Sequence, residues 1–516
     1  MGGKAWGMVA GLALAALSAA ALGARAEPVR AHIDSGALVG DATGAVAVFK
    51  GVPYVAAPVG PLRWAPPATA PAWRGERASL AYGSICPQKV NANGAPNEGG
   101  AFGPTSENCL FLNVWAPRAG VGHPGAAPVM VWLHGGSNAF GAGSLGVYEG
   151  GAFVRDGVIL VTVNYRLGAL GFFAHPALTA AAKRGEPLAN YGIMDQIAAL
   201  KWVRRNIAAF GGDPAKVTVF GESAGGSDVL TLMASPLARG LFQRAIVESG
   251  GGWSPPVTLA AREVRGEALA VKAGAPAHAT AAQLRALPVD ALVGAGGDDF
   301  GEAIDGRLLT QSPAQAFADG QVAKVPLLIG SNSYEASLMA TLKLTPAQVL
   351  AFLPAAPRAA YADVNDEKAL ASAMFTDSFM GGPARWIAGQ ASGGPSYLYH
   401  FSYVPSAARP FLPGAGHASE IPFVFDTWDK LGVMAMGVKL TAADQAVADA
   451  MHGCWVAFAR TGVPSCSGGP AWPSYNRARD TLMEFNGAPP VLVTHFRQRQ
   501  LDAQEAAALP KLELKK

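Results

Sequence analysis

A serine between two glycines is the first residue of this sequence that could do chemistry. The stretch KVTVFGESAGGSDVL, residues 216–230, places Ser223 two residues after Gly221 and two residues before Gly225. The chain has 63 glycines among 516 residues, so this short pattern carries little weight alone. A serine hydroxyl becomes a nucleophile when a base takes its proton and a carboxylate orients that base. The pattern is meaningful only if the chain supplies both groups.

Glu335 and His417 are the candidates for these two groups. Glu335 lies in LLIGSNSYEASL, shortly after an apolar run, and His417 lies in the loop sequence PGAGHASEIPFVF. The chain order Ser, Glu, His is that of α/β-hydrolases. His400 alternates with apolar residues as in a strand, and His134 stands beside a diglycine that it would shape, so both favour structural roles. As a base, His417 would lose activity on protonation near pH ~6.5 if its pKa is unperturbed.

Backbone N–H groups that could receive an oxyanion occur in two places. The segment VWLHGGSNAFGAG, residues 131–143, presents residues 135–137 as successive N–H groups after an apolar run. Ala224 opens a helix-compatible segment that extends to about residue 235, so its N–H is free to receive negative charge. Gly221 and Gly225 permit the sharp strand-to-helix turn between these elements, where a Cβ would clash.

The elements around these residues predict an α/β fold. Residues 129–133, 158–163, 217–220 and 326–329 are short, continuous apolar runs without the alternation of a half-exposed strand. They predict strands buried on both faces. Residues 194–207 instead carry apolar side chains three or four positions apart, as a helix does. We expect a large, mostly parallel central sheet covered by helices on both faces.

Composition limits the partners and the number of domains. The formal net charge of +3 is small for this length and forms no basic stripe, which argues against a nucleic-acid partner. No charge run, Ser/Gly linker or repeat separates independent units, so we expect one domain over residues 27–516.

The first 26 residues predict a signal peptide. Lys4 supplies the positive start, residues 8–22 are apolar, and residues 24–26 form a small-x-small cleavage site. The alternative is a membrane anchor, but the apolar run is shorter than the roughly 20 residues a span needs. We expect cleavage after about Ala26 and an exported protein, periplasmic or secreted, without stable membrane insertion.

Four cysteines favour disulfide bonds. An even count behind a signal peptide is typical of an oxidising compartment. Sequence neighbours make Cys86–Cys109 and Cys454–Cys466 the natural pairing among three possible ones. A zinc site is the competing interpretation, but no two cysteines stand two to four residues apart and no histidine pair accompanies them. We therefore predict no metal site.

A series of motifs along nearly the whole mature chain resembles the type B carboxylesterases, which include cholinesterases, bacterial para-nitrobenzyl esterases and fungal lipases. The motifs occur in the expected order: FKGVPYVAAPVGPLRW, SENCLFLNVW, NYRLGALGFF, NYGIMDQIAALKWVRRNIAAFGGDPAKVTVFGESAGG and HASEIPFVF. The bacterial para-nitrobenzyl type is closest in style. The resemblance implies the α/β-hydrolase fold and ester hydrolysis through an acyl-enzyme, with no metal or organic cofactor.

The resemblance also assigns roles to individual residues. It makes Ser223 the nucleophile, His417 the base and Glu335 the acid that orients the base. The oxyanion-hole N–H groups it implies are those of Gly136, Ser137 and Ala224. Ser137 departs from the all-glycine version of this loop, but a small side chain should be tolerated because the backbone makes the contact.

Other positions match the family's supporting features. Glu222 and Ser249 match buried polar residues behind the triad, and Trp253 is either an acyl-pocket residue or plain core. The pair Cys86–Cys109 matches the family's first disulfide, whereas Cys454–Cys466 has no counterpart we rely on. Two internal ion pairs also match the family: Arg63 with Glu107, and Arg166 with Asp195.

The loop between the first two cysteines narrows the substrate. Its sequence, PQKVNANGAPNEGGAFGPTSEN, has no tryptophan to hold a quaternary ammonium, which disfavours choline esters. It also lacks the apolar helical stripe of a lipase lid. We predict a short- to medium-chain or aryl ester, with a bulky natural or xenobiotic ester, or lipase action, as alternatives. A non-catalytic binding or adhesion member of the fold is the alternative of another class, and it is disfavoured because the triad is complete.

Overall fold

The computed structural model describes residues 27–91, 93–97, 99–296, 300–430, 440–512 and 514 of the chain. The predicted signal peptide, residues 1–26, lies outside the described residues.

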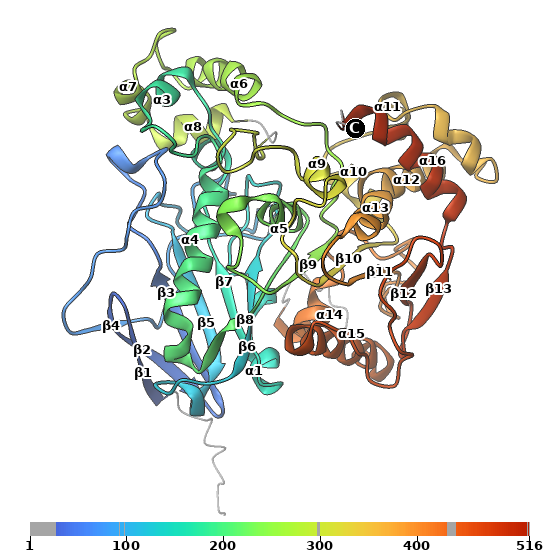
Figure 1. Ribbon diagram of the computed structural model, residues 1–516, viewed down its shortest axis with the longest axis horizontal. Helices are drawn as coiled ribbons and strands as arrows, with labels where there is room; N and C mark the ends of the chain where they lie inside the picture. The colour runs from blue at the N-terminus through green and yellow to red at the C-terminus, as the bar shows by residue number, and fades with distance from the viewer. Residues whose placement is uncertain are drawn as a thin grey trace, which may run out of the picture.

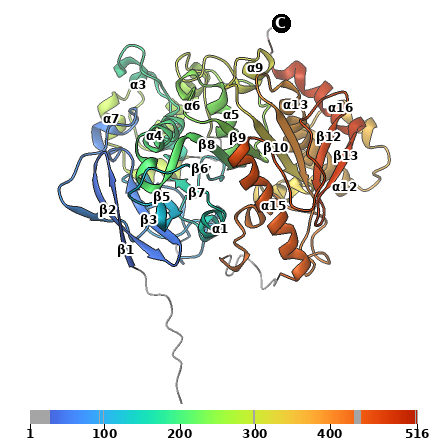
Figure 2. The same ribbon diagram turned by 60° about the horizontal axis from the view of Figure 1, so that its bottom comes forward.

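One large sheet runs through the molecule. Over the described ranges it contains 13 strands in the order β1-β2-β3-β5-β7-β6-β8-β9-β10-β11-β12-β13, with β4 paired to β2. Figures 1 and 2 place β1–β3 at one end of the sheet and β12 and β13 at the other. The strands are β1 Glu27–Ile33, β2 Gly36–Thr43, β3 Val46–Pro53, β4 Glu76–Ala78, β5 Phe111–Pro117, β6 Ala127–Leu133, β7 Ile159–Val163, β8 Gly212–Glu222, β9 Arg244–Glu248, β10 Leu327–Asn332, β11 Ser396–Phe401, β12 Thr481–Phe485 and β13 Val491–Thr494.

The centre of the sheet is parallel and its ends are antiparallel. β7, β6, β8, β9, β10, β11 and β12 pair in parallel, whereas β1, β2, β3, β5 and β7 pair antiparallel, as do β12 and β13. The register aligns Leu133 of β6 with Gly221 of β8, and Glu222 of β8 with Glu248 of β9. The loops that follow these strands therefore begin at one edge of the sheet, where ligands bind in such folds.

Helices cover both faces of the sheet. They are α1 Gly151–Arg155, α2 Gly168–Gly171, α3 Pro176–Ala181, α4 Tyr191–Asn206, α5 Ala224–Ala234, α6 Leu259–Lys272, α7 Ala281–Arg285, α8 Val289–Ala295, α9 Pro313–Ala318, α10 Leu338–Thr341, α11 Pro346–Phe352, α12 Glu367–Thr376, α13 Gly382–Gln390, α14 Ile421–Phe425, α15 Ala442–Thr461 and α16 Gln498–Ala508. None of those in the described ranges has both the length and the apolar character to cross a bilayer.

Alternate side chains of β6 show why both faces are covered. Val131 and Leu133 belong to one buried cluster with Leu200 of α4 and Leu230 of α5. The intervening Trp132 belongs to a second cluster, which contains side chains of α15. Because successive side chains of a strand point to opposite faces, a continuous apolar run needs a helical layer on each side. The predicted fold class is confirmed, and the four predicted strands correspond to β6, β7, β8 and β10.

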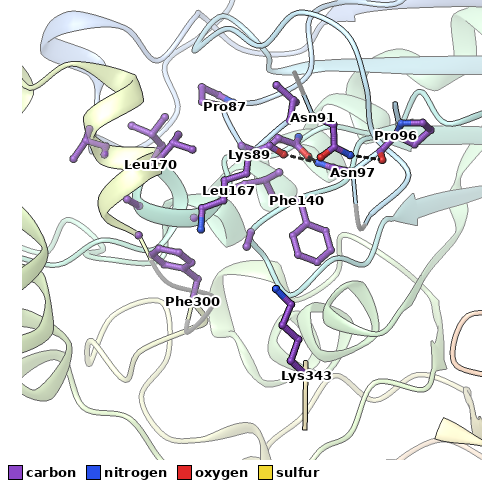
Figure 3. Close-up of a pocket in the computed structure, with 18 residues that line it drawn as sticks. Pro87, Lys89, Asn91, Pro96, Asn97, Phe140, Leu167, Leu170, Phe300 and Lys343 are labelled. Atoms are coloured by element: carbon purple, nitrogen blue, oxygen red, sulfur yellow. Dashed lines mark hydrogen bonds between the residues drawn. The ribbon is translucent and has the colours of Figure 1, made fainter. Parts of the chain in front are cut away.

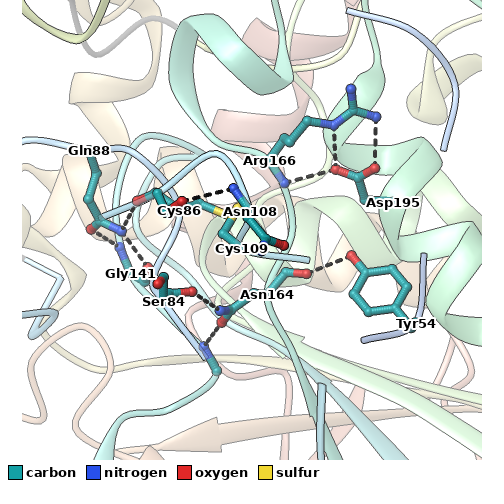
Figure 4. Close-up of a disulfide and its surroundings, with 12 residues drawn as sticks. Tyr54, Ser84, Cys86, Gln88, Asn108, Cys109, Gly141, Asn164, Arg166 and Asp195 are labelled. Carbon is teal, nitrogen blue, oxygen red and sulfur yellow. Dashed lines mark hydrogen bonds and ion pairs between the residues drawn. A yellow bond between two sulfur atoms is a disulfide. The ribbon is translucent and has the colours of Figure 1, made fainter. Parts of the chain in front are cut away.

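Both predicted disulfides are present. Cys86–Cys109 and Cys454–Cys466 have Cα atoms 4.9 Å and 4.6 Å apart. Figure 4 shows that Gln88, two residues after Cys86, reaches the segment that follows β6: its amide donates to the Gly141 carbonyl at 2.9 Å, and the Gly141 N–H donates back at 2.8 Å. The first disulfide loop is therefore tied to the segment that carries residues 135–137.

The predicted internal ion pairs are also formed. The Arg166 guanidinium donates to both carboxylate oxygens of Asp195 at 2.8 Å, and both side chains are buried (Figure 4). Arg63 binds Glu107 in the same two-pronged way, at 2.7 and 2.5 Å. Such bidentate pairs fix the geometry of the segments that carry them.

Candidate active site

Ser223 occupies a strained turn between β8 and α5. Its backbone has φ 56° and ψ −122°, a region that non-glycine residues rarely adopt, and it is the N-cap of α5. The flanking glycines are required by contact. A Cβ on Gly225 would lie 2.0 Å from the Leu133 carbonyl oxygen, and one on Gly221 would lie 2.6 Å from the Gly225 carbonyl. The turn therefore forms only where α5 packs directly on the end of β6.

The segment after β6 lies against this turn. A Cβ on Gly135 would approach the Ser223 Cβ to 3.1 Å. Gly136, Ser137 and Asn138 follow with φ of 109°, 53° and 54°, so three successive residues are left-handed. Within the described ranges, the N–H groups of Gly136, Ser137 and Ala224 donate to no protein acceptor. They are available to a negatively charged oxygen beside Ser223.

Glu335 holds the imidazole of His417. Glu335 begins a short 3-10 turn, Glu335–Ser337, directly after β10, and its Oε2 lies 2.6 Å from His417 Nδ1. Its other oxygen accepts hydrogen bonds from the Ser249 hydroxyl and the Asn332 N–H, both at 2.6 Å. The His417 N–H donates to Ser337 Oγ at 2.8 Å. These contacts fix the orientation of the ring and place the proton on Nδ1, which leaves Nε2 as the basic nitrogen.

Nε2 of His417 faces Glu222 rather than Ser223. It lies 3.0 Å from Glu222 Oε1, but the contact lacks hydrogen-bond geometry and neither atom has another partner in the described residues. No hydrogen bond joins Ser223 and His417 within the same ranges. Nε2 is thus buried without a hydrogen-bond partner in the described residues, and it lies beside the residue that precedes Ser223.

Burial and neighbouring carboxylates set the protonation of this site. Burial lowers the pKa of His417, but the charges of Glu222 and Glu335 outweigh it and raise the pKa to about 10. Burial also raises the pKa of Glu222 to about 7, although the His417 charge opposes this rise. The value near 6.5 expected for an unperturbed histidine does not hold, because Glu222 stabilises the imidazolium.

Two further buried carboxylates, which the sequence reasoning did not single out, lie behind this pair. Burial raises the pKa of Glu420 to about 8, and burial raises that of Glu248 well above its usual value. The Asn332 amide donates to Glu420, and the Trp455 indole donates to Glu248 at 2.8 Å. Glu420 stands three residues after His417 in the motif HASE, which is the signal that could have identified it. No group of His, Cys, Asp or Glu in the described residues is arranged to hold a metal ion.

The rival histidines have structural surroundings. His134 stacks on Tyr165 with ring centroids 4.5 Å apart, and burial lowers its pKa to about 4. His400 packs against Phe496 at 4.4 Å, and burial lowers its pKa to about 3. Burial therefore keeps both rings neutral near pH 7, and each packs against an aromatic side chain.

A cavity of about 390 Å³ opens in front of Ser223, and Ser137 and Ala224 also line it. Trp253 is not among the residues that line it. Its indole donates to the Ser378 carbonyl at 2.8 Å and packs on Gly382, so it lies behind the wall that Gly251 and Gly252 form.

Comparison with known proteins now identifies the family. The profile of the Carboxylesterase family matches residues 28–504. The chain belongs to this family. Two similar relatives are the fumonisin B1 esterase of Sphingopyxis macrogoltabida, 36% identical over 90% of this chain and 89% of the relative, and the para-nitrobenzyl esterase of Bacillus subtilis (strain 168), 36% identical over 87% and 93%. A solved structure of PNB esterase matches with a TM-score of 0.82 at 32% identity, covering 92% of this chain and 99% of that chain. This carboxylesterase therefore has the α/β-hydrolase fold and is a carboxylic ester hydrolase.

Replacing Glu222 by glutamine should move the pH profile of the carboxylesterase. Removing the charge beside Nε2 lowers the pKa of His417, so the neutral base persists to lower pH. We expect the acid limb of kcat/KM to shift downward by roughly 1–3 pH units, with a lower plateau because the imidazolium loses stabilisation. Steady-state kinetics from about pH 5 to about pH 11 measure this, since the wild-type limb should be centred near a pKa of about 10 for His417. Glu76→Gln, which removes an exposed partner of Arg30, is the control and should leave the limb in place. An unmoved limb in Glu222→Gln would exclude Glu222 as a determinant of the His417 pKa.

Proposed function

We propose that Ser223, His417 and Glu335 form the catalytic triad and that the N–H groups of Gly136, Ser137 and Ala224 form the oxyanion hole. The observation that carries this proposal is the 2.6 Å contact between Glu335 and His417, which leaves Nε2 beside Glu222, the residue before Ser223, without a hydrogen-bond partner in the described residues. The register of β6, β8 and β9 supports it, because the segments concerned start at one edge of the sheet.

The proposed reaction proceeds in two half-reactions. Ser223 Oγ attacks the ester carbonyl while His417 Nε2 takes its proton, and the carbonyl oxygen becomes an oxyanion held by the three N–H groups. The intermediate collapses, and His417 returns the proton to the departing alcohol. Water then attacks the acyl-enzyme, His417 accepts its proton, and the acid leaves as Ser223 regains its hydrogen. Glu335 stabilises the imidazolium in both halves.

Ser223→Ala should reduce kcat roughly 10⁵–10⁶-fold, since it removes the nucleophile and leaves only binding and the oxyanion hole. Hydrolysis of a 4-nitrophenyl ester by the purified variant measures this. A fluorophosphonate probe should label the wild-type protein once per chain and leave Ser223→Ala unlabelled. An unlabelled wild-type protein would favour the non-catalytic binding alternative, and substantial turnover by Ser223→Ala would refute the assignment.

For the substrate, we propose a short- to medium-chain or aryl ester. The cavity in front of Ser223 is small, about 390 Å³, and its lining includes the side chains of Leu230, Leu309 and Phe379. A choline-binding aromatic is disfavoured because Phe102, the only aromatic residue in the sequence between Cys86 and Cys109, is 61% exposed. The alternative of a bulky natural ester is supported by the second cavity described below.

A series of 4-nitrophenyl esters tests the acyl-chain preference. We expect kcat/KM to be highest for acyl chains of up to about eight carbons and to fall at least tenfold by about sixteen, because the longer chain exceeds the cavity. The leaving group is constant across the series, so the trend reports the acyl site. The highest activity on emulsified long-chain esters would instead support the lipase alternative.

We also propose that residues 1–26 are a signal peptide and that residues 27–516 form one exported domain. Two disulfides are compatible with an oxidising compartment. One sheet includes strands from Glu27 to Thr494, which supports a single domain. Intact-mass measurement of the exported protein, expected to begin at Glu27, tests the cleavage site.

A further inference from the structure

A second cavity adjoins the one in front of Ser223. It has a volume of about 570 Å³ and is shown in Figure 3. Phe300 lines both cavities. Asn138 lines the first cavity and the next two residues, Ala139 and Phe140, line the second. The two cavities therefore meet at Phe300 and along residues 138–140, which places the second cavity next to any ester held at Ser223.

The second cavity combines apolar walls with two positive charges. Phe140, Leu167 and Phe300 supply apolar surface, and Lys89 and Lys343 enter from opposite walls (Figure 3). Among the described residues that line it, none is Asp or Glu, and neither lysine forms an ion pair with another residue of the described ranges. A cleft with charges of one sign and low-dielectric walls attracts ligands of the opposite charge.

From this juxtaposition we propose that the second cavity binds a carboxylate carried by the ester substrate, with Lys89 and Lys343 as its counter-ions and Phe140 and Phe300 against its apolar part. The inference rests on the proposed function, since the subsite has meaning only for an ester held at Ser223. The subsite implies that the substrates are anionic esters that carry a bulky group next to the ester bond.

Two matched aryl butyrates test this subsite. One carries a carboxylate on the aryl leaving group, and the other carries the primary amide of the same carboxylate, which is uncharged and adds no second ester bond. The wild-type enzyme should prefer the anionic ester about tenfold in kcat/KM, with the preference falling in high salt, because exposed charge pairs are screened. Lys89→Gln with Lys343→Gln should bring the ratio to about one. Lys272→Gln, an exposed lysine at the end of α6, should leave the ratio unchanged.

The outcomes separate the subsite from the proposed function. Equal rates on the two esters in the wild-type enzyme, or a preference that survives the double substitution, would overturn the subsite while ester hydrolysis itself stands. If neither ester is hydrolysed, the proposed function fails instead.

A different observation carries a second inference. It concerns residues 136–138, the segment that carries two of the three proposed oxyanion-hole N–H groups. Ser137 and Asn138 are held in left-handed conformations, which residues other than glycine adopt uncommonly. Asn138 Nδ2 donates to Asp228 Oδ1 at 3.1 Å, and the Gly168 N–H donates to the Asn138 carbonyl at 2.6 Å. The second Asp228 oxygen accepts from Gln196 Nε2 at 2.5 Å. Asp228 and Gln196 are fully buried.

We infer that Asp228 is a positioning residue for the oxyanion hole, acting through Asn138. Asp228 lies on α5, five residues after Ser223, so one helix carries the nucleophile at its end and holds the opposing loop from its side. Gln196 of α4 fixes the Asp228 carboxylate from behind. The inference also rests on the proposed function, because it assigns Asp228 to the same site.

Exchanging the two partners tests this connection. Asn138→Asp sets two carboxylates against each other in a buried place, so it should lower kcat roughly 10–100-fold by displacing the loop, with KM little changed. In the double variant that also carries Asp228→Asn, the contact again has one donor and one acceptor. Most of the lost kcat should therefore be recovered. Affinity for a trifluoromethyl ketone, whose adduct presents an oxyanion, should fall and recover in parallel with kcat.

Fluorophosphonate labelling of Asn138→Asp shows whether Ser223 remains reactive. This distinguishes loss of the Asn138–Asp228 contact from loss of the nucleophile itself. If Asn138→Asp does not fold, Asn138→Ala deletes the contact without adding charge and should show the same loss of kcat. Wild-type kcat in a folded single variant, or no recovery in a folded double variant, would overturn the inference.

Discussion

The packing of α5 on the end of β6 is the constraint on which the site depends. Gly225 of α5 approaches the Leu133 carbonyl so closely that a side chain would lie 2.0 Å from it. This contact bends the chain sharply at Ser223 and brings residues 135–138 against the same turn. The parallel register then aligns the ends of β8 and β9, which bring Ser249 close to Glu335. Backbone packing thus brings Ser223 and residues 135–138 together, and side-chain hydrogen bonds then hold Glu335 and His417 beside them.

The carboxylates of the site are buried, and burial disfavours their ionised form. Buried carboxylates cost free energy when ionised, which is why the pKa values of Glu222, Glu248 and Glu420 are raised. The same carboxylates favour a positive charge on His417, whose pKa they raise to about 10. The cluster therefore stabilises the protonated imidazole. Hydrogen bonds from Asn332 and Trp455 keep these carboxylates in place.

A feature of this protein could be predicted from the sequence where it depends only on residues that are close together in the chain. Continuous apolar runs predicted the buried strands, and the glycines around Ser223 predicted the turn, because both follow from local sterics. The Asn138–Asp228 hydrogen bond was not predicted, since 90 residues separate its partners and polar pairing has no sequence period. The position of Trp253 behind the cavity wall, and the second cavity beside Phe300, depend on how loops fold over the sheet. The contact of Glu222 with His417 likewise arises only in three dimensions.

The sheet and the loops thus carry different parts of the function. The sheet sets the turn at Ser223 and the direction of the Glu335 side chain, and these contacts leave little room for variation. The disulfide loop, by contrast, forms a wall of the second cavity with Gln88 and Lys89. Gln88 nevertheless exchanges two hydrogen bonds with Gly141, three residues after Asn138. The wall of the second cavity is therefore joined to the segment that lies against the Ser223 turn, so the disulfide loop and this segment hold each other in place.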